Sequence, residues 1–296
     1  MLKYQKGVAS VAFNGYDPLP ITQQPVSVNM VFYPSFVATN VALAGSELST
    51  NMTNMKVLDL MTTMMESRSQ DAADDIGNFL QGDGSSFGGK APMGLAGIVD
   101  NGSDLASYGG LSRATYAALN ATVTAAASNK ISLLQVRQLW NAISDGPVRP
   151  DMIITDYTTW AYFEQLLTPF QRNVMSEFEM NIAKKASASG YADLIWDGME
   201  IYRDKKIVTG DFYMLNTKFL NFYNLNWWEG EKISPRAKVI EGNVYEDSEY
   251  DPSAFTWTGW IRPYNMGAIN GFMIFGGQLI CTNCSRQGVL NSITGI

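Results

Sequence analysis

The longest helical pattern in the chain covers residues 54–81, and it limits the folds that the remainder can adopt. At 1.5 Å per residue this helix is roughly 42 Å long, so we expect it to lie across a broad, flat domain. Gly82 is a suitable residue to end it. Apolar residues recur at intervals of three, four or seven, which places them on one stripe of the helix: Met55, Leu58, Met61, Met65, Ala72, Ile76 and Phe79.

Three stretches before this helix are rich in Val, Phe and Ala and are expected to be strands: residues 8–13, 26–33 and 36–43. Residues 14–25 hold an Asn-Gly pair and three prolines, which predicts an irregular tip between the first two strands. We therefore expect an extended β ribbon. Such a ribbon is marginal alone in water, so it should pack on another surface, and its reach favours an adjacent subunit. The apolar side chains available for that contact are Phe13, Val31, Phe32 and Phe36.

The second half of the chain mixes helices and strands without regular alternation. A helix is expected at 132–144 and a short buried strand at 151–155, after which Asp156 can cap the next helix. Mixed elements of this kind predict an α+β fold. Further strands are expected at 199–203, 211–216, 236–247, 254–262 and 268–275.

Composition excludes several function classes. The net charge of −7 disfavours dedicated nucleic-acid binding, which needs a basic patch, and leaves only weak nonspecific contact with DNA. Charged residues make up 17% of the chain, against about 25% in typical proteins. This indicates either a surface largely in contact with other protein or a neutral polar surface, and composition does not separate the two. We expect neither a secretion signal nor a membrane span, since the sequence shows no pattern typical of either.

The sequence offers little support for a metal or cofactor site. The chain has no histidine, which removes the commonest general base and the commonest metal ligand. Cys281 and Cys284 have Cys-x-x-Cys spacing, but two thiols alone cannot supply the roughly four ligands of a structural zinc site. They follow an apolar strand instead of opening a helix in a βαβ unit, so we interpret them as incidental thiols. No metal, cofactor or catalytic residue is expected.

One stretch permits an enzymatic alternative. Residues 226–231 (NWWEGE) set two tryptophans beside two carboxylates, the residue types of a sugar-binding or glycosidase site. Aromatic anchors of a protein interface use the same residue types, and we favour that interpretation. The residues concerned are Trp227, Trp228, Glu229 and Glu231.

The segment 92–120 is long for a connector, since most compact domains join their elements with about 4–6 residues. It contains Gly94-Leu95, Ile98-Val99-Asp100, the block YGGLSR at 108–113, and Asn120. In this order, and directly after the long helix, these residues resemble a signature of the major capsid proteins of tailed bacteriophages. Three later segments, at 149–167, 198–217 and 276–296, are similar to the corresponding parts of that family. The resemblance covers about residue 30 to the C-terminus.

The resemblance implies the Hong Kong 97-type capsid fold, an α+β fold with an extended β loop, a long spine helix, and peripheral and axial domains. Residues 1–48 would form a short N-terminal segment and the extended loop, and 49–95 the peripheral domain with the spine helix. Residues 96–226 would be axial, 227–272 peripheral strands, and 273–296 the axial return and tail. Family members have a longer segment before the extended loop, so arm-mediated locking is not predicted here.

The function implied by the resemblance is structural. The chain would assemble with itself into hexamers and pentamers of an icosahedral shell that encloses double-stranded DNA, in the host cytoplasm, and would end in the virion capsid. Scaffold, portal and decoration proteins are further possible partners, and an encapsulin-like nanocompartment shell is the alternative within the same fold. No lysine between residues 7 and 45 is available for a covalent crosslink in the loop. The candidate inter-subunit contacts are Phe13, Val31, Phe32, Phe36, Tyr108, Gly109, Gly110, Arg113, Trp227 and Trp228.

The pair Gly109-Gly110 carries a local prediction. Glycine adopts positive φ angles that other residues resist, and we expect at least one of the two to do so. We also expect Arg113 or Asn120 to bind carbonyl groups that the long connector leaves without backbone partners.

Overall fold

The computed structural model describes residues 2–3, 14–15, 27–50, 54–171, 194–224, 238–240, 243–245, 255–264 and 267–296. The chain divides into two compact units. The first unit comprises Met1–Phe32, Leu95–Asn221 and Ile280–Ile296, and the second comprises Tyr33–Gly94 and Phe222–Leu279. The chain thus passes between the units near residues 32, 94, 221 and 279. The sequence predicted domain boundaries at 48, 95, 226 and 272.

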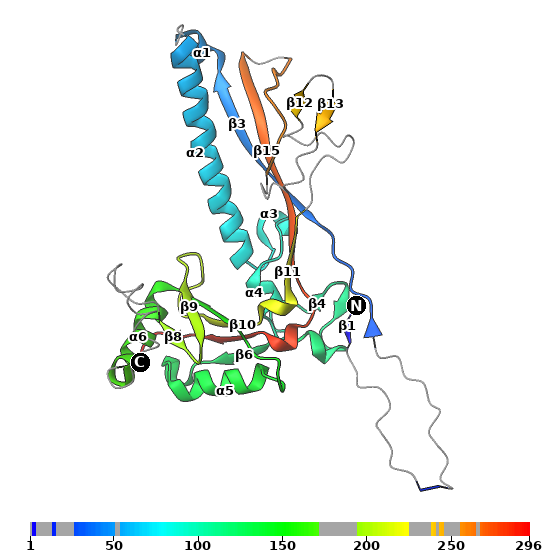
Figure 1. Ribbon diagram of the computed structural model, residues 1–296, viewed down its shortest axis with the longest axis vertical. Helices are drawn as coiled ribbons and strands as arrows, with labels where there is room; N and C mark the ends of the chain where they lie inside the picture. The colour runs from blue at the N-terminus through cyan, green and yellow to red at the C-terminus, as the bar shows by residue number, and fades with distance from the viewer. Residues whose placement is uncertain are drawn as a thin grey trace. The chain divides into compact units, whose positions relative to one another are not determined.

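A six-stranded sheet forms the centre of the first unit (Figure 1). Its strand order is β6-β16-β10-β7-β9-β8, and the pairs β6–β16 and β7–β9 are parallel. The strands predicted at 151–155, 199–203 and 211–216 are confirmed as β7, β9 and β10, whereas the other three were not predicted. The bounds are β6 Thr122–Ala125, β7 Met152–Thr155, β8 Ile195–Trp196, β9 Met199–Arg203, β10 Phe212–Leu215 and β16 Gly288–Asn291.

Two helices pack their apolar sides into the core of this unit. α5 (Leu133–Ile143) confirms the predicted helix, and the side chain of Ser132 caps it by accepting from the Gln135 N–H. α6 (Tyr157–Gln171) begins after Asp156, whose carboxylate accepts from the N–H groups of Thr158 and Thr159, as predicted. The core combines buried side chains of both helices with those of the sheet, among them Val136, Leu139, Phe163, Ile153, Phe212, Met214 and Leu290.

Short elements of the first unit precede and follow these two helices in the sequence. They are α4 Leu95–Ile98, the hairpin strands β4 Ser107–Tyr108 and β5 Leu111–Ser112, and four 3-10 turns. These turns are η1 Ala117–Leu119, η2 Ala127–Asn129, η3 Thr217–Phe219 and η4 Cys284–Arg286.

The second unit is built from longer elements. α2 (Asn54–Gln81) matches the predicted helix, and it packs along β3 (Ser35–Ala44) (Figure 1). Ala72 and Phe79 of the predicted stripe are buried, and the acidic residues at 71, 74 and 75 are exposed. β3 pairs antiparallel with β15 (Ala268–Cys281), which extends well beyond the strand predicted at 268–275.

Smaller elements accompany this pair of long strands. β11 (Leu220–Asn224) and β14 (Phe255–Trp257) also pair with β15. α1 Gly45–Thr50 and α3 Ser86–Gly89 flank α2 in the sequence. The long strand predicted at 236–247 is instead a hairpin of β12 Lys238–Ile240 and β13 Asn243–Tyr245.

The N-terminal ribbon is described at its base and at its tip. β1 (Leu2–Lys3) pairs antiparallel with β2 (Ser27–Val28), with Leu2 opposite Val28 and Lys3 opposite Ser27. Residue 15 is therefore halfway along the chain between the paired residues. Gly15 lies in a turn, and its N–H donates to the side chain of Asn14. The Asn14-Gly15 turn predicted from the sequence therefore coincides with the midpoint of the pairing. The strand predicted at 8–13 lies outside the described residues.

Candidate assembly site

The predicted site residues converge on the hairpin between β4 and β5. Gly109 and Gly110 form its two-residue turn, with φ angles of 57° and 76°. Positive φ at both central positions is the conformation that a tight two-residue hairpin demands and that glycine adopts without strain. The prediction of positive φ at this pair is confirmed.

The base of the N-terminal ribbon packs on this hairpin. The N–H of Val31 donates to the carbonyl of Gly109 at 3.0 Å, and the ring of Phe32 meets that of Tyr108 edge-on at 5.1 Å between centroids. A Cβ atom on Gly109 would lie 2.8 Å from Cζ of Phe32 and 2.9 Å from Cβ of Met30, whereas one on Gly110 would meet nothing within 4 Å. We call Met30, Val31, Phe32, Tyr108 and Gly109 the ribbon anchor.

Tyr108 connects the ribbon anchor to the return strand β15. Its hydroxyl accepts from the N–H of Cys281 at 2.7 Å and donates to the carbonyl of the same residue at 3.3 Å. One phenol thus satisfies both backbone groups of Cys281. Burial raises the pKa of Tyr108 well above its ordinary value, so the hydroxyl remains a donor at all physiological pH values.

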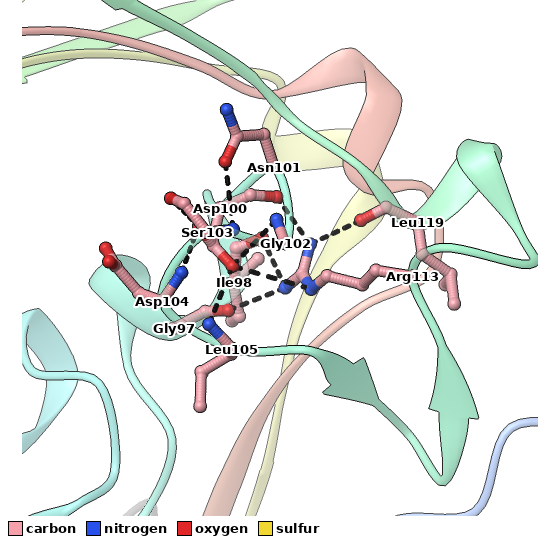
Figure 2. Close-up of polar contacts among 10 residues, drawn as sticks. All are labelled: Gly97, Ile98, Asp100, Asn101, Gly102, Ser103, Asp104, Leu105, Arg113 and Leu119. Carbon is pink, nitrogen blue, oxygen red and sulfur yellow. Dashed lines mark hydrogen bonds and ion pairs between the residues drawn. The ribbon is translucent and has the colours of Figure 1, made fainter.

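Arg113 holds the connector from the inside, and Figure 2 shows its guanidinium pointing into the loop that begins at Gly97. Nη1 donates to the carbonyls of Asp100 and Leu119, both at 2.5 Å, and Nη2 donates to those of Gly97 at 2.7 Å and Ile98 at 3.3 Å. The guanidinium also lies over the Tyr108 ring, 5.2 Å from its centroid. The prediction that Arg113 binds carbonyls of the connector is confirmed.

Asp100 balances this buried charge. Its Oδ2 lies 3.8 Å from Nε of Arg113 and accepts from the N–H groups of Gly102 and Leu105, both at 3.0 Å. Oδ1 accepts from Ser103 Oγ and, at 3.4 Å, from the N–H of Asp104 (Figure 2). Burial alone would raise the pKa of Asp100, but these N–H donors and Arg113 together hold it below its ordinary value. We call Arg113, Asp100 and the groups that they bind the arginine hub.

A second carboxylate of this unit, Asp211, has its pKa shifted in the opposite direction to that of Asp100. Burial, assisted by the nearby charge of Asp156, raises the pKa of Asp211 to about 6, although the Tyr213 hydroxyl donates to it at 3.3 Å. Asp156 itself is buried and accepts from the N–H of Gly210 in addition to capping α6. The contribution of Asp211 to stability is therefore expected to change in mildly acidic solution.

The structure brings together six of the ten predicted contact residues, with Gly110 at the tip of the hairpin. Val31, Phe32, Tyr108, Gly109 and Arg113 form one continuous set of contacts inside a single chain. Phe32 packs against Tyr108 and Gly109 of its own chain, and its contact with a neighbouring subunit stays a prediction. Tyr108 and Arg113 are buried in the same way, so the contacts shown for them are internal.

The remaining predicted residues are placed differently. Phe36 lies on β3 in the second unit with 42% of its surface exposed. Phe13, Trp227, Trp228, Glu229 and Glu231 lie outside the described residues. Within the described part of the chain, no group of three or more Cys, Asp or Glu residues is arranged to hold a metal ion. The helices described there include none with the length and hydropathy of a membrane span.

Sequence reasoning missed Asp100 and Met30 as members of this site. The run Asp100-Asn101-Gly102 is a turn signal, because Asp side chains accept from backbone N–H groups two residues ahead. That signal predicts the turn but not the arginine that the same carboxylate meets. Met30 has no local signal, since its role depends on the glycine that the fold places against it.

Comparison with solved structures shows the same fold along almost the whole chain. The capsid asymmetric unit of cyanophage A-1(L) matches with a TM-score of 0.72 at 13% identity, over 99% of this chain and 86% of that one. The capsid of an empty GTA particle matches with a TM-score of 0.54 at 9% identity, over 98% and 83%. The holo-SrpI encapsulin complex from Synechococcus elongatus PCC 7942 matches with a TM-score of 0.50 at 12% identity, over 88% and 75%.

These likenesses show that the chain has the fold of phage capsid proteins, the α+β Hong Kong 97-type fold. The sequence itself matches no protein-family model and no curated protein.

Proposed function

We propose that the protein is the major shell subunit of a phage-type capsid, which assembles with itself into hexamers and pentamers of an icosahedral particle enclosing double-stranded DNA. The observation that carries this proposal is the match to a cyanophage capsid subunit over 99% of the chain. A fold shared along almost the whole chain supports the same architectural role.

The ribbon anchor supports a specific route to assembly. A two-stranded ribbon has almost no core of its own and gains stability only by covering another surface. The anchor fixes where the base of the ribbon meets the rest of the first unit, because Val31 and Phe32 are held at Gly109. We assign the extended-loop role to this ribbon and propose that it lies on an adjacent subunit in the shell.

The two units of the chain are assigned to the two domains of a capsid subunit. The first unit, with the arginine hub, takes the axial position around the capsomer, and the second, with α2 as the spine helix, takes the peripheral position. Scaffold, portal and decoration proteins are proposed as partners by analogy of fold alone. Contact with packaged DNA is proposed to be weak and nonspecific, in line with the net charge of −7.

An encapsulin-like shell is the second candidate, because the encapsulin complex shares the fold over 88% of this chain. The higher TM-score and the fuller coverage favour the phage-type capsid. Particles isolated from the cells that produce them separate the two, since a capsid protects double-stranded DNA from added nuclease and an encapsulin-like shell holds protein cargo. A carbohydrate-active enzyme built on Trp227 and Glu229 is not proposed, and glycan hydrolysis by the soluble subunit would reopen it.

Assembly of the full chain tests the proposal. We expect rings or closed shells by light scattering and negative-stain microscopy, with a scaffold supplied if needed. Replacing residues 14–25 by a short Gly-Ser turn should leave a folded, soluble subunit that forms no closed shells, because the contact to the neighbour is lost. A wild-type chain that stays monomeric under all these conditions contradicts the proposal, and normal shells from the replaced chain contradict the ribbon's role.

A further inference from the structure

The chain contains three Asn-Gly dipeptides, at residues 14–15, 101–102 and 270–271. Such a pair is chemically reactive, because the backbone nitrogen of the glycine can attack the side-chain carboxamide of the asparagine before it. Glycine has no Cβ atom to obstruct the attack or to restrict the backbone during it. The structure places the three pairs in a turn, in a loop and in the strand β15, so the same two residues can be compared in three settings.

At the tip of the ribbon the two reacting groups lie side by side. The N–H of Gly15 donates to Oδ1 of Asn14 at 3.1 Å, and both residues are exposed. Oδ1 is bonded to the carbon that the nitrogen attacks, so this contact holds that carbon close to the nitrogen, as a reaction between neighbouring groups requires. A Cβ atom on Gly15 would meet nothing within 4 Å, which leaves room for the turn to rearrange as a ring closes.

In the loop of the arginine hub the same two groups are directed to other partners. The N–H of Gly102 donates to Oδ2 of Asp100 at 3.0 Å, and Oδ1 of Asn101 accepts from the N–H of Ser103 at 3.1 Å (Figure 2). Asn101 is exposed, as Asn14 is, so exposure does not distinguish the two sites. The attacking nitrogen at this site must first give up a hydrogen bond to a carboxylate, which is stronger than one between neutral groups.

The third pair is restrained by the sheet of the second unit. Asn270 and Gly271 lie opposite Ala42 and Val41 in the antiparallel ladder between β15 and β3. The backbone N–H and carbonyl of Asn270 also exchange hydrogen bonds with those of Ile261. This backbone is held extended from both sides, so a ring can close here only after the sheet opens locally.

We propose that Asn14 is a site of spontaneous covalent modification, at which water converts the side-chain carboxamide to a carboxylic acid, and that the fold makes this Asn-Gly pair the most reactive of the three. The contacts of the glycine and asparagine in each pair carry the proposal. The reaction is a property of the single chain and does not depend on shell formation.

The reaction has two steps and needs only water. The nitrogen of Gly15 forms a bond to Cγ of Asn14, and the amide group of that side chain leaves as ammonia with the proton of the Gly15 N–H. The product is a succinimide ring. Water then breaks one of the two bonds between the Gly15 nitrogen and the ring carbonyls. Breaking the bond to Cγ leaves aspartate, and breaking the bond to the main-chain carbonyl carbon leaves isoaspartate. Nothing is oxidised or reduced.

An effect on assembly follows if the proposed function holds, and this step rests on it. The modified tip carries a new carboxylate, which loses more hydration than a carboxamide does when the ribbon lies on an adjacent subunit. Isoaspartate also lengthens the backbone at the turn by one carbon atom. We therefore expect modified subunits to enter shells less readily than unmodified ones.

The experiment incubates the folded full chain at mildly alkaline pH in heavy-oxygen water and follows the three asparagine-containing peptides by chromatography and mass spectrometry. Asn14 should become a mixture of aspartate and isoaspartate that carries one heavy oxygen atom. Asn101 and Asn270 should react at least about tenfold more slowly, the factor that one protecting hydrogen bond provides. The same chain in denaturant should show similar rates at all three sites.

Gly15→Val is the matched control. Gly15 does not adopt a positive φ and has open space around it, so the variant should fold as the wild type does. Its branched side chain crowds the attacking nitrogen and should lower the rate at Asn14 about tenfold. A rate at Asn14 that Gly15→Val leaves unchanged would show that another group attacks, and the proposed site would be wrong.

Two further results would overturn the proposal. One is a folded chain that keeps the Asn14 carboxamide while the denatured chain loses it. The other is a rate at Asn101 or Asn270 equal to that at Asn14 in the folded chain, because the contacts at those sites would then give no protection.

The effect on assembly is measured separately, on partly modified wild-type subunits that are allowed to form particles. The modified fraction should be several-fold higher in the unassembled pool than in the particles. Equal fractions would contradict the effect on assembly. A chain that forms no particles would contradict the proposed function instead, and the reaction at Asn14 of the free subunit would still decide the modification site.

Discussion

Two of the arginine–aspartate pairs in the described part of the chain lie in very different surroundings. Arg68 and Asp71 lie on α2, 3.1 Å apart, with 47% and 55% of their side chains exposed. Arg113 and Asp100 of the arginine hub are 3.8 Å apart, with only 1% and 2% exposed. The closer pair is the one that water surrounds, so distance alone does not rank the two.

The difference lies in the groups with which each guanidinium interacts. Water can solvate the Arg68 guanidinium as favourably as the Asp71 carboxylate binds it, so an exposed pair of this kind contributes little to stability. Arg113 has exchanged water for four carbonyl groups and the nearby carboxylate of Asp100. A buried arginine of this kind is costly to disturb, because its removal takes the opposite charge away from a buried carboxylate and a hydrogen bond away from each carbonyl.

The largest effect is expected from Arg113→Ala. Loss of the hub should lower the free energy of unfolding by about 3–5 kcal/mol, because the buried Asp100 carboxylate loses its opposite charge and several carbonyls lose a donor. Denaturant unfolding of the soluble subunit measures this. Arg113→Lys should recover only a small part, since an ammonium group cannot reach carbonyls on several sides as the guanidinium does. A loss below about 1 kcal/mol would remove the distinction between the two pairs.

A moderate effect is expected at the hairpin turn, where the chain offers a matched pair of glycines. Both Gly109→Ala and Gly110→Ala place alanine at positive φ, at a cost of roughly 1–2 kcal/mol each. Only the methyl group at 109 collides with Met30 and Phe32, so this variant should lose about 1–3 kcal/mol more. Shell yield should fall far more for Gly109→Ala. Equal yields would show that the ribbon anchor does not direct assembly.

A pH-dependent effect is expected from Asp211, whose folded pKa of about 6 lies above its unfolded value near 3.8. The folded state binds the proton of the Asp211 carboxyl group more tightly than the unfolded state does. The stabilisation that this proton provides is therefore fully present below pH 4 and is lost as the pH rises to about 6. Asp211→Asn should therefore gain stability relative to the wild type between pH 4 and 7. The measurement is chemical unfolding at several pH values, and a constant difference across that range would contradict the assignment.

The smallest effect is expected from Arg68→Ala on the exposed face of α2. The free energy of unfolding should change by less than about 0.5 kcal/mol, because the pair is solvated and only three residues apart on the helix. The same unfolding experiment used for Arg113 measures it. A larger loss would show that the face of α2 around Arg68 contributes contacts that its exposure does not suggest.

The long elements could be predicted from the sequence because their information is local. The period of apolar residues fixed α2 at residues 54–81, and cap residues placed the starts of α5 and α6 at Ser132 and Asp156. The pair Gly109-Gly110 predicted its own backbone conformation. Each of these signals lies within a few residues of the feature that it predicts.

The site could be predicted only in part because its information is long-range. The hydroxyl of Tyr108 meets Cys281, which is distant in the sequence, and no local pattern connects them. The short strands β6, β8 and β16 are stabilised by neighbours in the sheet more than by their own propensity, so they were missed. The single long strand predicted at 236–247 divides into β12 and β13, and Gly242 between them is a turn signal that the prediction did not use.

The most direct test of the central claim is a three-dimensional reconstruction of the assembled particles by electron cryomicroscopy. The account predicts an icosahedral shell in which each ribbon leaves its own subunit at Gly109 and lies on a neighbouring subunit. Particles without icosahedral order, or a shell in which the ribbon folds back onto the subunit that carries it, would contradict the account.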